Sequence, residues 1–142
     1  MKVVIDTNIL VGALLRDGGA CRAVLRLCLE GQLQPLVGVA LFAEMEDVLS
    51  RSSLFRSSVL DQAEREDLFA AFLSVTAWVP IYYSWRPNLR DEADNHVVEL
   101  AVAGNATYII TQNRRDFASM ELQFPDLKIA TAAEFLENWR AT

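Results

Sequence analysis

Acidic and hydroxyl side chains stand directly behind the first apolar run of the chain. Met1-Lys-Val-Val-Ile is followed by Asp6, Thr7 and Asn8. An apolar run of this length is typical of a buried strand, and polar oxygens at its end would lie where open α/β sheets bind their ligands. Asp6 is therefore the first candidate for chemistry, although an aspartate that opens a helix is also a common N-cap.

Further carboxylates follow at comparable places later in the chain. Glu44 lies in a predicted helix, nearer its apolar side than Asp47, although an acidic solvated face is the ordinary alternative. Asp91 and Asp94 are three residues apart at a helix start, which places both on one face, although both could serve the helix end as caps. Asp116 follows a predicted strand that ends at Thr111, in a place that also suits a turn residue. Together they predict a carboxylate cluster at one edge of one sheet.

Carboxylate oxygens select hard divalent cations, Mg²⁺ or Mn²⁺, over zinc or copper. Two such ions about 4 Å apart can activate a water molecule and stabilise the leaving alkoxide of a phosphate ester. Metal-assisted phosphodiester hydrolysis is the chemistry that this cluster suits. The sequence contains no Walker A loop and no dinucleotide-binding fingerprint, which argues against nucleoside-triphosphate and hydride chemistry.

The elements that must position these residues alternate between strand and helix. The boundaries of these elements are marked by Gly18-Gly19, Pro87 and Gly104-Asn105, and by two capping-box patterns, Asp61 with Glu64 and Thr131 with Glu134. Predicted strands cover 3–5, 33–37, 77–81, 107–111 and 127–130; predicted helices follow Asp6 and cover 20–30, 40–49, 61–75, 91–103 and the segment after Thr131. This alternation favours an α/β fold with a mostly parallel sheet covered on both faces.

Composition places the chain among globular domains. Of its 142 residues, 52% are hydrophobic and 23% charged, so we expect a single domain over residues 1–142. No apolar run approaches a membrane span, and Asp6 interrupts the first apolar stretch, which argues against a signal peptide. We expect a soluble cytoplasmic protein. Cys21 and Cys28 are too far apart along one predicted helix to pair, so free, buried thiols are expected.

The formal net charge of −6 is unusual for a protein that binds nucleic acid. Either the partner is not nucleic acid, or several acids bind cations that reverse the local field. The arginines near the predicted acids could form a basic rim or be ordinary solvated surface: Arg16, Arg22, Arg26, Arg86, Arg90, Arg114 and Arg115.

Four segments in this order resemble the PIN-domain family, and within it the small prokaryotic toxin–antitoxin ribonucleases (VapC-like). The match covers nearly the whole chain, and no one of the segments is specific alone. The segments are Val-Val-Ile-Asp-Thr-Asn-Ile-Leu-Val-Gly-Ala-Leu-Leu from Val3, Leu-Phe-Ala-Glu-Met-Glu-Asp-Val-Leu from Leu41, Asp-Glu-Ala-Asp-Asn-His-Val-Val-Glu-Leu-Ala from Asp91, and Tyr-Ile-Ile-Thr-Gln-Asn-Arg-Arg-Asp-Phe from Tyr108.

The resemblance implies a three-layer α/β/α sandwich with a five-stranded parallel sheet and endoribonuclease activity that depends on Mg²⁺ or Mn²⁺. It also implies a homodimer, and an antitoxin protein whose C-terminal segment blocks the site. The residues that it assigns on this chain are the metal ligands Asp6, Glu44 and Asp94, Asp91 as a further ligand or supporting acid, Thr7 and Thr111 as donors to ligand oxygens, and Asn8 as the residue that orients Asp6.

One position departs from the family pattern. Many members carry aspartate two residues after the threonine that ends the fourth strand, where this chain has Asn113. The carbonyl oxygen of asparagine can still ligate a metal but brings no charge. Asp116 is then the candidate for the fourth acid, and we hypothesise one resting metal with a second ion arriving with the substrate.

His96 lies two residues after Asp94, about 200° around a helix. We therefore expect it to point away from the carboxylates and to have no catalytic role. Two other functions compete with a ribonuclease. A phosphatase with an aspartyl nucleophile usually has a second acid where this chain has Asn8. A catalytically weak PIN-like module that binds RNA or protein is favoured by Asn113 and by the negative net charge.

Overall fold

The computed structural model describes residues 1–81, 95–117 and 124–141. Its five strands form one sheet in which every neighbouring pair is parallel. The strand order is β3-β2-β1-β4-β5. The strands are β1 (Lys2–Ile5), β2 (Gln34–Val37), β3 (Ala77–Trp78), β4 (Tyr108–Ile110) and β5 (Lys128–Ala130).

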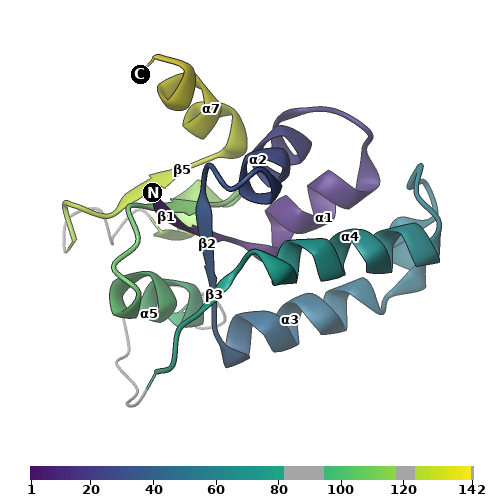
Figure 1. The fold of residues 1–142 in the computed structure, drawn as a ribbon, viewed down its shortest axis with the longest axis horizontal. Coiled ribbons are helices and arrows are strands. Elements are labelled where there is room, and N and C mark those ends of the chain that lie inside the picture. Colours follow the sequence, from purple (N-terminus) through teal and green to yellow (C-terminus); the bar gives the residue numbers. More distant parts are fainter. Residues whose placement is uncertain (82–94, 118–123, 142) are drawn as a thin grey trace.

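Helices cover both faces of this sheet, as the alternation of elements predicted (Figure 1). Helix α5 packs on β1, β2 and β4, whereas α2 packs on α1 and α7 on the opposite side of the sheet. The three-layer α/β/α sandwich is therefore confirmed. The helices are α1 (Thr7–Leu15), α2 (Ala20–Leu29), α3 (Val39–Leu49), α4 (Gln62–Ser74), α5 (Asn95–Ala103) and α7 (Ala132–Ala141), with short 3₁₀ turns η1 (Ser52–Phe55) and η3 (Arg114–Phe117).

The central strands are apolar on both faces, which is why they lie in the middle of a parallel sheet. Every residue of β4 is buried, and so are Val3, Val4 and Ile5 of β1. The two capping boxes are also present: Asp61 and Glu64 bond reciprocally at the start of α4, and so do Thr131 and Glu134 before α7. In the described part of the chain, no helix is long and apolar enough to cross a membrane.

The third strand is shorter than the predicted 77–81. Trp78 is paired with Val37, the last residue of β2, and the hydrogen bond from Val79 N to Val37 O (2.8 Å) ends the pairing. Strand β2 stops there because Gly38 turns the chain into α3. An edge strand has no second neighbour, so the end of its partner ends it too.

Proline inside β2 is tolerated because its missing N–H faces the short strand. Gln34 N bonds to Met1 O on the β1 side (2.9 Å), so the Pro35 nitrogen faces the β3 side. Strand β3 begins only opposite Leu36. The side chain of Gln34 supplies a replacement donor, because its Nε2 bonds to Val75 O at 2.8 Å.

A Gly104→Ala variant tests how closely α5 approaches the sheet. A Cβ at Gly104 would lie 2.4 Å from Leu36 Cδ1 and 3.2 Å from both Leu100 O and Val79 Cγ2. We expect a loss of about 1–3 kcal/mol in the free energy of unfolding, because neighbours on two elements must move. Urea denaturation measures it. Gly18→Ala is the control: its Cβ would meet no atom within 4 Å, so an equal loss would contradict the packing argument.

Candidate functional site

The direction of the strand order reverses at β1, which has β2 on one side and β4 on the other. In open parallel sheets the crevice at the carboxyl ends of the strands at such a point is the usual ligand site. Asp6 directly follows β1 and Thr111 directly follows β4. The two strand ends are joined there, because Asp6 N donates to Ile110 O at 3.0 Å.

Both oxygens of the Asp6 carboxylate accept hydrogen bonds. Oδ1 accepts from Thr7 N at 2.8 Å, which makes Asp6 the N-cap of α1. Oδ2 accepts from Thr111 Oγ1 at 2.8 Å and from Asn8 Nδ2 at 3.3 Å. Asp6 is only 4% exposed. Asp6 is therefore the N-cap of α1 through Oδ1, and it remains a candidate site residue through Oδ2.

The surroundings of Asp6 favour a bound proton or a bound cation. Burial is the largest influence and raises the pKa of the carboxyl above its ordinary value. The Thr111 hydrogen bond opposes this rise, the charge of Glu44 adds to it, and the Thr7 N–H opposes it again. Two neighbouring carboxylates repel each other unless a positive charge intervenes, so this pair suits a divalent cation.

Glu44 reaches the site from α3 and is held by a residue of α5. Its Oε2 lies 2.6 Å from His96 Nε2. This contact is the largest cause of the lowered pKa of Glu44, which burial opposes and the Thr7 hydroxyl supports. The side chain of Glu44 is 37% exposed against 65% for Asp47, in agreement with the predicted helix phase.

The prediction that His96 points away from the carboxylates is wrong for Glu44. Helix periodicity compares His96 only with residues of its own helix, such as Asp94. Glu44 belongs to α3, which packs against α5, and the ring reaches it across that contact.

The two cysteines, in contrast, are free as predicted, with Cys28 buried and Cys21 half-buried.

The Thr7 hydroxyl is a buried oxygen beside both carboxylates. Thr7 is 4% exposed, and its Oγ1 makes no hydrogen bond with any residue that the structure describes. It lies close enough to Glu44 to lower the pKa of that carboxyl. Because buried polar atoms rarely lack a partner, this oxygen fits a site that receives a ligand.

The loop after β4 is tied to Asp6 through Asn8 and Thr111. Asn8 Oδ1 accepts from Gln112 N at 3.1 Å, and its Nδ2 lies 3.3 Å from Thr111 Oγ1. Thr111 Oγ1 also accepts from Asn113 N at 3.1 Å. The sequence gives no signal for Gln112, because its backbone N–H, and not its side chain, makes this contact.

The predicted metal ligands are only partly brought together. Asp91 and Asp94 lie outside the described residues. Within residues 1–81, 95–117 and 124–141, no three His, Cys, Asp or Glu side chains form a group that could hold a metal ion. Asp116, whose N donates to Asn113 O at 3.0 Å, therefore forms no such group with Asp6 and Glu44.

The arginines predicted to form a basic rim differ in their surroundings. Arg22 donates from Nε to Ala13 O at 2.8 Å with a side chain only 16% exposed, so it serves the end of α1. Arg114 lies 3.6 Å from the Glu134 carboxylate. Arg86 and Arg90 lie outside the described residues. The exposed arginines that remain for a rim are Arg16, Arg26 and Arg115.

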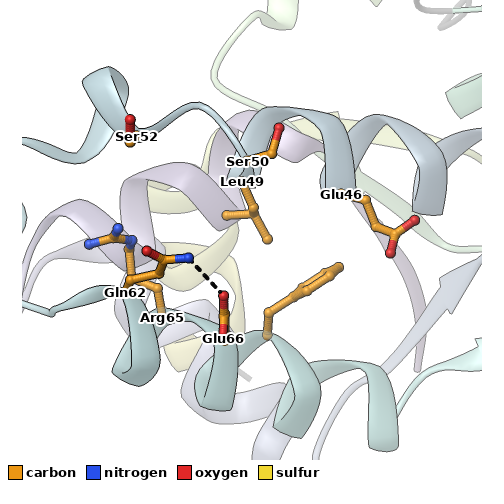
Figure 2. A pocket seen from close by; sticks show the side chains of 8 residues that line it. Glu46, Leu49, Ser50, Ser52, Gln62, Arg65 and Glu66 are labelled. Carbon is orange, nitrogen blue, oxygen red and sulfur yellow. Dashed lines mark hydrogen bonds between the residues drawn. The ribbon is translucent and has the colours of Figure 1, made fainter.

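A cavity of about 410 Å³ between α3 and α4 lies away from this site (Figure 2). Leu49 and Phe69 line it together with charged residues such as Glu46 and Arg65. Glu46 is two residues from Glu44, which is about 200° around the helix, so the two glutamates serve different faces of α3. None of the predicted site residues lines this cavity.

Comparison with known proteins identifies the class. A family model for the PIN domain matches residues 2–115, so the chain belongs to the PIN-domain family. Proteins of this family are typically nucleases and generally use divalent metals. None of the curated proteins compared with the chain matches it.

Among solved structures, a similar chain comes from the crystal structure of VapBC2 from Rickettsia felis bound to a DNA fragment from their promoter. The TM-score is 0.57 at 17% sequence identity, over 91% of this chain and 97% of that chain. At this identity the likeness shows the fold, which agrees with the α/β/α sandwich described above.

A Thr111→Val variant removes the hydroxyl that donates to Asp6. We expect a loss of about 1.5–3 kcal/mol in the free energy of unfolding, because a buried hydrogen bond to a charged group is lost. The pKa of Asp6 should rise further. The raised pKa means that ionised Asp6 opposes folding, so the loss should be larger at neutral pH than at about pH 4. Urea denaturation at both pH values measures it.

Thr107→Val is the matched control, because Thr107 lies at the amino end of β4 and Thr111 at its carboxyl end. It makes the same change of hydroxyl to methyl without touching Asp6. A pH dependence that is the same in both variants would contradict the assignment of the effect to the Asp6 carboxylate.

Proposed function

We propose that this chain is a metal-dependent endoribonuclease that hydrolyses phosphodiester bonds in RNA. The observation that carries the proposal is the environment of Asp6. Its carboxylate is buried at the reversal point of a PIN-domain sheet and accepts a hydrogen bond from Thr111. The charge of Glu44 raises the pKa of this carboxyl. A buried carboxylate beside a second acid is disfavoured unless a positive charge is near, which is the arrangement expected where a cation completes the site.

Each residue of the site has a role in this proposal. Mg²⁺ or Mn²⁺ would be held by Asp6, Glu44 and Asp94, with Asp91 or Asn113 completing the oxygen ligands. When bound, such an ion polarises the phosphate and lowers the pKa of a coordinated water. Thr111 and Asn8 keep the Asp6 carboxylate in one orientation. The Thr7 hydroxyl can donate to an oxygen of the ligand or substrate.

Attraction of RNA must overcome the net charge of −6. A bound cation reverses the field at the acids themselves. The exposed arginines Arg16, Arg26 and Arg115 would then contact phosphates, which position a nucleic acid without reading its sequence. The binding would weaken with added salt, because phosphate contacts release counterions.

We further propose that the chain is the toxin component of a toxin–antitoxin module, a homodimer in the cytoplasm whose antitoxin partner blocks the site. The resemblance of its four motifs to that branch supports this assignment. The fold shared with a chain of VapBC2 from Rickettsia felis is consistent with it.

Cleavage of a mixed single-stranded RNA pool tests the activity. Wild-type protein should cut with Mn²⁺ or Mg²⁺ and not with EDTA. Asp6→Asn should slow the cutting by more than about 100-fold, because even the outer partners of metal ligands are worth about 10–100-fold. Gel analysis of end-labelled fragments gives both the rate and the cut sites.

Asp17→Asn is the matched control, since it removes the same charge from a side chain that is 87% exposed. It should cut as fast as wild type. Well-folded, metal-saturated wild-type protein that cuts nothing in this pool would contradict the proposal and favour a PIN-like module that only binds RNA or protein.

Metal-dependent stability tests the site without any substrate. Mn²⁺ at about 100 times its dissociation constant should stabilise the wild type by about 2.7 kcal/mol through mass action. Asp94→Asn should lose most of this gain and be no less stable than wild type without metal, because one repelling carboxylate is gone. Thermal denaturation over a range of Mn²⁺ concentrations measures it, and identical responses of the two proteins would exclude the predicted cluster.

A further inference from the structure

The Glu44 carboxylate is hydrogen-bonded to His96. Its Oε2 lies 2.6 Å from the Nε2 atom of the ring. The imidazole is mostly buried, with 20% of its side chain exposed. This contact joins two helices, since Glu44 lies in the middle of α3 and His96 is the second residue of α5.

The chemistry of the two groups settles which atom carries the hydrogen. An ionised carboxylate only accepts hydrogen bonds, so His96 Nε2 must carry the proton and donate it. The other ring nitrogen, Nδ1, is buried and has no hydrogen-bond partner within the described residues. The donation to Glu44 is therefore the polar contact that orients the ring there.

The place of Glu44 makes this orientation consequential. A glutamate side chain has three rotatable bonds, and His96 supplies the 2.6 Å hydrogen bond that holds this carboxylate, beside the Thr7 hydroxyl. Asp6, in contrast, is held by Thr7, Asn8 and Thr111. The two acids of the candidate site are thus positioned by different means, Asp6 from its own strand end and Glu44 across the α3–α5 contact.

We propose that His96 is a positioning residue for Glu44: its Nε2–H holds the Glu44 carboxylate in the orientation that faces Asp6 and a divalent cation. This inference rests on the proposed metal site. Groups that hydrogen-bond to metal-ligating carboxylates are typically worth about 10–100-fold in metal affinity. His96 acts through Glu44 and does not touch the substrate.

Mn²⁺ affinity of His96 variants, measured by isothermal titration, tests the proposal. His96→Leu removes the donor and should weaken Mn²⁺ binding by about 10–100-fold. His96→Gln should retain most of the affinity, because its amide Nε2 carries an N–H at nearly the same distance from the backbone. Saturating Mn²⁺ should restore RNA cleavage to His96→Leu, since only metal binding is impaired.

Two controls separate positioning from general damage to the helix contact. Arg51→Leu breaks another charged pair of α3, with Asp47 at 2.7 Å, and should bind Mn²⁺ as wild type does. In a Glu44→Ala background, His96→Leu should lower the affinity no further, because the group that it positions is already lost. The chain has one histidine, so its ring ¹H–¹⁵N spectrum reports the Nε2–H proton of His96 without ambiguity.

The possible failures are distinguishable. Wild type that binds no Mn²⁺ overturns the proposed metal site and this inference with it. Wild type that binds and cuts, together with a His96→Leu protein of unchanged affinity, overturns only the role of His96. A His96→Gln protein that binds Mn²⁺ normally but does not cut at saturation would also overturn it, and would place the ring in the chemistry itself.

Discussion

The hydrogen bond from Thr111 to Asp6 is the contact on which the rest of the site depends. It exists because β1 and β4 are neighbours in the sheet, with Ile5 paired to Ile110, so that the next residue of each strand stands at the same edge. The register itself is set by apolar burial, since Ile5 and Ile110 are 2% and 0% exposed. The Asp6–Thr111 pair is thus positioned by apolar strand residues that carry no reactive groups.

The ionised Asp6 carboxylate is an unfavourable charge at the end of a buried strand. Burial and the Glu44 carboxylate both raise the pKa of Asp6, while Thr111 and Thr7 oppose the rise. The hydrogen bonds keep the acid ionisable, and the remaining repulsion is what a cation would relieve. A local departure from the stability optimum of this kind is expected at functional sites and is tolerated because the core around it is well packed.

Sequence patterns predicted what depends on a single element. The polar residues behind β1, the capping boxes at Asp61 and Thr131, and the phase of Glu44 all follow from periodicity within one strand or helix. The contact of His96 with Glu44 could not be found in this way, because it joins two helices separated in the sequence and periodicity relates residues of one helix only. The length of β3 likewise depends on where its partner strand β2 ends. The contact of Gln112 with Asn8 is made by a backbone N–H, so the type of side chain does not predict it.

An anomalous difference map from crystals grown with Mn²⁺ would show whether Asp6 and Glu44 bind a metal ion, since it locates the ion without reference to activity. We predict a peak bonded to a carboxylate oxygen of Asp6 and of Glu44, at the reversal point of the strand order. A peak at other acids only, or none in a protein that Mn²⁺ stabilises, would contradict it.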